Sequence, residues 1–168
     1  MNLDWLYRGC GFLAALCLVI IAVLIILQII GRLLGFIIPS ADDIAGYCMA
    51  ASIFLALADT LRAGGHIRVT MFIGWLPAPL LRIVEFLNVS IGVIFTGYFA
   101  WYASSMVWQT YQFGEISQGY LPIPLWMPQF TMAFGLFVLF LAFVEEWYRV
   151  VRGLPPHYAE SAEAARTE

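Results

Sequence analysis

The chain has 168 residues, of which 62% are hydrophobic and only 11% charged, and its formal net charge is −3. A soluble domain is about half apolar and a quarter charged, so this composition excludes a water-soluble globule. All eight basic residues are arginines and they form no basic stripe, which argues against nucleic acid as a partner.

The sequence predicts an all-α integral membrane protein with four transmembrane helices. Each apolar stretch is near the roughly 20 residues needed to cross the hydrocarbon core of a bilayer. The first stretch is longer than the apolar region of a signal peptide and lacks a small-residue cleavage site, so we expect it to remain as an anchor. The expected spans are about residues 9–34, 42–61, 83–110 and 126–148, within a membrane domain of residues 1–152 that precedes a polar tail, 153–168.

The start of the second span carries helix-initiating residues. Ser40 and, three residues later, Asp43 match a capping box, in which the serine side chain bonds a backbone N–H of the first turn. Asp42 adds a second negative charge at the positive end of the helix dipole. We therefore expect the second helix to begin at Ser40.

The segment after the second span reads as a sharp corner. Gly64 and Gly65 suit a tight turn because glycine reaches positive φ without steric cost. Arg62, His66 and Arg68 surround this glycine pair. The following residues, about 67–76, are apolar but too short to cross a membrane, which predicts a helix lying in the membrane plane.

Small residues recur along several spans and allow another helix to approach closely. Gly31 and Gly35 form a GxxxG pattern near the end of the first span. The third span has a stripe at every fourth position, whose hydroxyl and amide groups can bond across an interface: Asn88, Gly92, Thr96, Ala100 and Ser104. The sequence leaves open whether these residues pack the four helices together or contact a partner.

Aromatic residues gather near the span ends, where interfacial belts occur. Anchoring explains them without a ligand. A cluster in the second half of the third span could alternatively face a soluble partner: Trp101, Tyr102, Trp108 and Tyr111.

The arginines predict the orientation of the chain. With four spans and a cytoplasmic N-terminus, seven arginines lie on the cytoplasmic side and only Arg32 on the opposite side. Because positively charged loops stay in the cytoplasm, we expect both termini there.

Ionisable groups are absent from the middles of the expected spans, which argues against autonomous ion-coupled transport. Near the span ends we expect three local charge pairs: Asp59 with Arg62, Arg82 with Glu85, and Glu145 with Arg149. A stand-alone four-helix exporter would need Asp59 or Glu85 far deeper in the membrane. A membrane anchor of a redox complex with bis-histidine haem would need two intramembrane histidines, whereas His66 and His157 lie outside the spans. We expect no catalytic, substrate-binding or metal-binding residues and no cofactor.

Several motifs resemble one family of membrane proteins. The acidic pair Asp42 and Asp43 is followed by the Arg62-Ala-Gly-Gly-His-Ile-Arg68 segment, and the fourth span begins with a Pro-x-Trp…Gly pattern at Pro124, Trp126 and Gly135. Together these resemble the DctQ family, the small membrane subunit of tripartite ATP-independent periplasmic (TRAP) transporters.

The resemblance implies a non-catalytic role. In such systems a periplasmic binding protein (DctP-like) captures an organic anion, often a carboxylate, and a large multi-span permease (DctM-like) moves it with a sodium gradient. The small subunit would act as a scaffold for the permease in the lipid of the inner membrane of a bacterium or archaeon. The motif residues would then be architectural.

Overall fold

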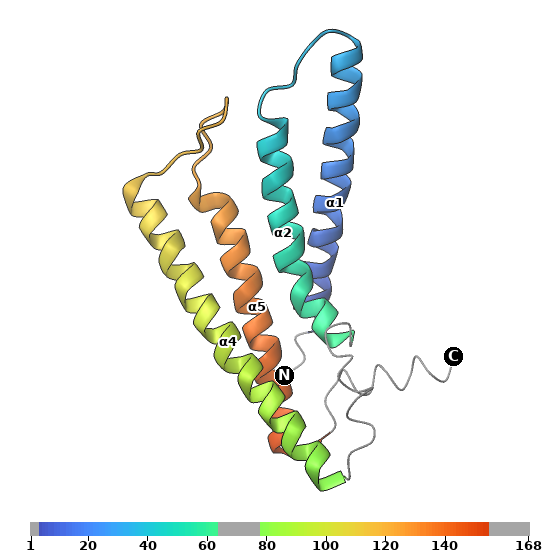
Figure 1. Ribbon diagram of the computed structural model, residues 1–168, viewed down its shortest axis with the longest axis vertical. Coiled ribbons are helices and arrows are strands. Elements are labelled where there is room, and N and C mark those ends of the chain that lie inside the picture. Colours follow the sequence, from blue (N-terminus) through green and yellow to red (C-terminus); the bar gives the residue numbers. More distant parts are fainter. Residues whose placement is uncertain (1–3, 64–77, 155–168) are drawn as a thin grey trace, which may run out of the picture.

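The computed structural model describes residues 4–63 and 78–154, and within them four long helices. These are α1 (Asp4–Leu33), α2 (Ala41–Arg62), α4 (Ala78–Phe113) and α5 (Trp126–Val151) (Figure 1). All four are long and apolar enough to cross a membrane. The predicted all-helical class, with four apolar helices long enough to be membrane spans, is therefore confirmed, and α4 extends beyond its expected span at both ends.

The helices lie side by side in a row rather than in a closed bundle. Extensive contacts join α1 to α2, α2 to α5, and α5 to α4, which gives the order α1, α2, α5, α4 across the molecule (Figure 1). The core lies between α1, α2 and α5, and Leu55, Val138 and Ala142 are among its buried residues. The helix α1 lies at one edge of the row, and only 6% of its most apolar, membrane-spanning stretch is buried.

The end of α1 corrects the GxxxG interpretation. The helix stops at Leu33, and Gly35 lies beyond it with φ +80°. Phe36 N donates a hydrogen bond of 2.9 Å to the Gly31 carbonyl, and Gly35 N donates one of 3.3 Å to the Arg32 carbonyl. This is the Schellman motif, in which glycine ends a helix at little steric cost. Gly35 therefore terminates α1 and does not extend a packing face.

Part of the predicted corner lies outside the described residues. This applies to Gly64, Gly65, His66, Arg68 and the expected in-plane segment 67–76. Arg62, the last residue of α2, is described.

Candidate functional site

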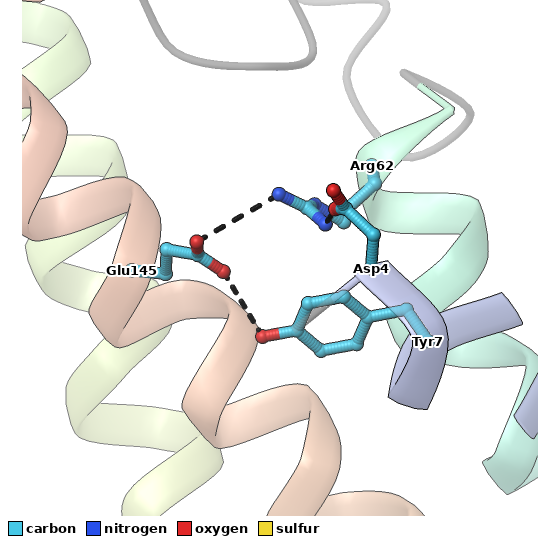
Figure 2. Close-up of polar contacts among 4 residues, drawn as sticks. All are labelled: Asp4, Tyr7, Arg62 and Glu145. Atoms are coloured by element: carbon cyan, nitrogen blue, oxygen red, sulfur yellow. Dashed lines mark hydrogen bonds and ion pairs between the residues drawn. The ribbon is translucent and has the colours of Figure 1, made fainter. Parts of the chain in front are cut away.

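A cluster of polar side chains joins α1, α2 and α5 at the end of the row that holds the start of α1 (Figures 1 and 2). Arg62 forms ion pairs with Asp4 and with Glu145, the latter with an Nη2–Oε1 distance of 3.8 Å. The Tyr7 hydroxyl donates a hydrogen bond of 3.2 Å to Glu145 Oε2. The Arg62 guanidinium also lies 4.8 Å from the centre of the Tyr7 ring. We call Asp4, Tyr7, Arg62 and Glu145 the charge cluster.

The charge cluster is unevenly exposed, and this decides which contacts stabilise the fold. The side chains of Arg62 and Glu145 are 14% and 15% exposed, whereas Asp4 is 60% exposed. Exposed pairs contribute about 0–1 kcal/mol, while removing one partner of a buried pair costs about 3–5 kcal/mol. Tyr7 is fully buried beside them. The contacts of Glu145 with Tyr7 and Arg62 therefore matter more than the Arg62–Asp4 pair.

The sequence identified these charges but assigned them local partners. It paired Arg62 with Asp59 and Glu145 with Arg149, because i,i+3 and i,i+4 neighbours share a helix face. In the structure Arg62 and Glu145 pair with each other and with α1. The Asp59 carboxylate lies against α1 instead: a Cβ placed on Gly11 would be 2.9 Å from Asp59 Oδ2.

Sequence reasoning missed Asp4 and gave Tyr7 only an anchoring role at the membrane interface. The available signal was Glu145, since an ionisable side chain inside an apolar helix normally has a polar partner. Which helix supplies that partner depends on the order of the helices in the row.

The opposite end of α2 shows a second set of long-range polar contacts. The capping box is wrong: Ser40 has φ +56° and its side chain makes no capping bond. Its Oγ instead accepts a hydrogen bond of 2.9 Å from Leu121 N, in the segment between α4 and α5. The Tyr47 hydroxyl donates one of 3.0 Å to Ser117 Oγ in the same segment. Ser40 and Tyr47 thus attach the α4–α5 segment to the start of α2.

The two aspartates of this end have different neighbours. Gln28 Nε2 of α1 donates a hydrogen bond of 2.8 Å to Asp42 Oδ1. Asp43 lies against Gly119, where an added Cβ would overlap Oδ2 of the carboxylate. Asp42 therefore faces α1, and Asp43 fills the space that a side chain at residue 119 would need.

Pro124 and Trp126 lie where the α4–α5 segment turns into α5. Ile116 and Pro124 form an isolated antiparallel bridge, supported by the hydrogen bond of 2.8 Å from Ser117 N to the Ile123 carbonyl. Trp126 is the first residue of α5, and its ring meets Tyr111 of α4 edge-on at 5.8 Å. Both residues shape the connection between α4 and α5.

Gly135 lies at the contact between α2 and α5. A Cβ added there would be 2.5 Å from the backbone oxygen of Phe54 and 2.6 Å from its carbonyl carbon. Backbone atoms cannot swing aside as a flexible side chain can. Only glycine permits this approach of the two helices.

The small-residue stripe of α4 is divided along its length. Gly92 packs against the Phe143 ring of α5, and Thr96 and Ala100 are buried. Asn88 and Ser104 are exposed. The hydroxyls bond back within α4, since Thr96 Oγ1 donates to the Gly92 carbonyl at 2.7 Å and Ser104 Oγ to the Ala100 carbonyl at 2.7 Å. The middle of the stripe thus packs internally, and both hydroxyls bond to carbonyl groups of their own helix.

Within residues 4–63 and 78–154, no group of three or more His, Cys, Asp or Glu side chains could hold a metal ion. The polar contacts described above join helices to one another. Their arrangement is that of a structural element rather than of a reactive site.

Two comparisons bear on the identity of the chain. No curated protein matches it. A family model described as "Tripartite ATP-independent periplasmic transporters, DctQ component" matches residues 21–153, which include α2, α4 and α5 entirely. The chain therefore belongs to the DctQ family and is a multi-pass, non-catalytic membrane component of a TRAP transporter.

Proposed function

We propose that this chain is the scaffold that holds the large DctM-like permease in place while the permease takes up an organic anion, a carboxylate by class, with a sodium gradient. A DctP-like periplasmic binding protein delivers the anion. The family membership supports the tripartite assembly. The substrate-binding and ion-coupling groups belong to the other two components.

The observation that carries the scaffold role is the open row of helices. A row of helices leaves two broad apolar faces and two edges. At one edge lies α1, and only 6% of its most apolar, membrane-spanning stretch is buried. Helix association within a bilayer depends on packing of such faces and on scattered polar contacts. The charge cluster and the Gly135 contact stiffen the row, which is what a scaffold requires.

The arginines support an orientation with both termini in the cytoplasm of a bacterial or archaeal cell. Arg8, Arg62 and Arg149 belong to the end of the row that carries the charge cluster, and Arg32 to the other. The positive-inside rule assigns the arginine-rich end to the cytoplasm. A reporter that is active only in the cytoplasm should be active when it is fused to the C-terminus. Activity of a periplasm-specific reporter at the same position would contradict the proposed orientation.

Reconstitution tests the scaffold role. Proteoliposomes containing the chain and the permease, supplied with the binding protein, should take up substrate when a sodium gradient is imposed. The chain alone should transport nothing, and the permease alone should lose most of its uptake. Sodium-driven uptake by the chain alone, or failure of the two membrane components to co-purify, contradicts the proposal.

The corner that follows α2 has an architectural role in this proposal. The motif residues Gly64, Gly65, His66 and Arg68 connect two membrane elements, and cationic side chains there can bind helix carbonyls or lipid phosphates. The double variant His66→Ala, Arg68→Ala should lower recovery of the assembled complex and leave the substrate preference unchanged. Altered preference with normal assembly would assign the segment to substrate selection.

A further inference from the structure

An apolar groove opens between α4 and α5 near the ends joined by the α4–α5 segment. Its volume is about 400 Å³, within the range of about 300–1,000 Å³ typical of ligand sites. Ser104 and Trp108 line it from α4, and Trp126, Phe130, Ala133 and Phe134 line it from α5. We call this the aromatic groove.

The groove exists because α4 and α5 pack differently along their length. Near the middle of the two helices, Gly92 receives the Phe143 ring, and a Cβ on Gly97 would meet the Phe140 ring at 3.0 Å. Glycines let the helices touch there. Toward the ends joined by the α4–α5 segment, large rings replace the glycines, and the two ribbons diverge (Figure 1). The rings cannot all interlock, so a cavity remains between them.

The depth of the groove places it in the hydrocarbon region of a membrane. Its α5 wall runs from Trp126, the first residue of the helix, to Phe137. At 1.5 Å per residue, these residues cover about 16 Å of the helix axis. The groove therefore runs from the helix ends near the interface, which we call its mouth, toward the membrane centre. Water does not fill an apolar cavity at that depth.

The lining distinguishes between two apolar occupants. A transmembrane helix of a partner packs on small residues, which let backbones approach. Only Ser104 and Ala133 are small among the lining residues, and the others are mainly aromatic. The Ser104 hydroxyl is already bonded to the Ala100 carbonyl, so it offers little to a partner helix. A narrow flexible chain fits between rings without such an approach.

The side chains at the mouth of the groove are suited to contact the ester region of a phospholipid. Trp126 and Tyr111 meet edge-on there, and indole and phenol groups favour the membrane–water interface, where one end of the ring is wet. Among residues 4–63 and 78–154, those that line the groove carry no charged side chain. The headgroup is therefore left outside and unselected.

We propose that the aromatic groove holds one acyl chain of a phospholipid, which fills the space between α4 and α5 and braces the two helices. The site is independent of the transport role proposed above. It selects a chain and not a headgroup, so phosphatidylglycerol and phosphatidylethanolamine with the same acyl chains should bind equally well.

Native mass spectrometry of the purified full-length chain, delipidated and titrated with each of these phospholipids, tests the proposal. The variant Ser104→Phe adds a ring inside the groove. The matched control is Ser105→Phe, because Ser105 is the next residue, makes the same kind of bond to a carbonyl four residues earlier, and is absent from the groove lining.

On titration, the wild-type chain and Ser105→Phe should each bind one phospholipid tightly, and Ser104→Phe should not. Equal binding by Ser104→Phe, or equal loss of binding by Ser105→Phe, overturns the proposal. A strong preference for one headgroup also overturns it. In a second preparation, co-expressed with the permease, loss of the permease from Ser104→Phe with an unchanged phospholipid count would show that a partner helix occupies the groove and would overturn the proposal. If Ser104→Phe is not monodisperse, Phe134→Ala, which removes one wall of the groove, should give the same loss of phospholipid.

Discussion

The Tyr7 hydroxyl near the start of α1 donates a hydrogen bond of 3.2 Å to Glu145 near the end of α5, across 138 residues of sequence. The two helices lie on opposite sides of α2 in the row (Figure 1). The bond therefore reaches past the last turn of α2, where Arg62 also contacts both residues. Three helices are thus joined at one point, at the end of the row that holds the start of α1.

Replacing Tyr7 with phenylalanine tests how much this hydrogen bond contributes to the stability of the fold. The ring remains, while Glu145 loses one donor and keeps Arg62. A hydrogen bond to a charged group contributes about 1.5–3 kcal/mol, so the melting temperature in detergent should fall by several degrees. The control is Tyr102→Phe, at an exposed position on α4. An equal melting temperature for Tyr7→Phe and the wild type would show that the bond does not hold α1.

Neutralising Arg62 should be more damaging than removing Tyr7. The variant Arg62→Met leaves Glu145, a side chain 15% exposed, without its countercharge, and such a loss costs about 3–5 kcal/mol when the pair is buried. The control Arg8→Met removes a positive charge at an exposed position of the same end. In thermal unfolding, the melting temperature of Arg62→Met should fall well below that of Arg8→Met.

A double variant separates repulsion from lost attraction in the charge cluster. Arg62→Met combined with Glu145→Gln removes the charges of both residues, so residue 145 no longer carries an unpaired, largely buried carboxylate, while Asp4 also loses Arg62 but is 60% exposed. It should recover part of the stability lost in Arg62→Met. Strictly additive losses in the three variants would mean that Arg62 and Glu145 are not coupled.

The extent to which the sequence predicted this structure differs between helices and contacts. Each span could be identified because apolar length is a local property, and Trp126 marked the start of α5 correctly. Local spacing failed where partners come from other helices, as for Arg62 and Glu145. It also failed for Ser40, whose side chain bonds Leu121 rather than its own helix. In the sequence, a serine near an acidic residue looks the same whether its side chain caps its own helix or bonds a distant segment.

The close approach of Asp43 to Gly119 gives a prediction for the opposite end. Gly119→Ala would place a methyl group on the Asp43 carboxylate, which must then turn away and loosen the α4–α5 segment. We expect a lower melting temperature and faster proteolysis between α4 and α5. Adding Asp43→Ala should restore most of the loss because it removes the obstacle. Failure of Asp43→Ala to compensate would show that residue 119 acts through its backbone.

Gly135 gives the sharpest comparison, because the chain offers a matched glycine that is free of contacts. A Cβ at Gly135 would meet backbone atoms of Phe54 at 2.5–2.6 Å, whereas a Cβ at Gly46 of α2 would meet nothing within 4 Å. Both residues lie inside helices, so alanine raises the helix propensity of each by up to about 1 kcal/mol. Gly46→Ala should therefore leave the melting temperature equal or slightly higher. Gly135→Ala must push α2 and α5 apart, and overpacking of this kind costs about 1–3 kcal/mol.

The separation of α2 and α5 in Gly135→Ala should also disturb the charge cluster, since Arg62 lies on α2 and Glu145 on α5. Measuring Gly135→Ala in the Glu145→Gln background tests that link: a smaller loss there than in the wild-type chain means that the helix contact positions the cluster, and an equal loss means that the two act independently.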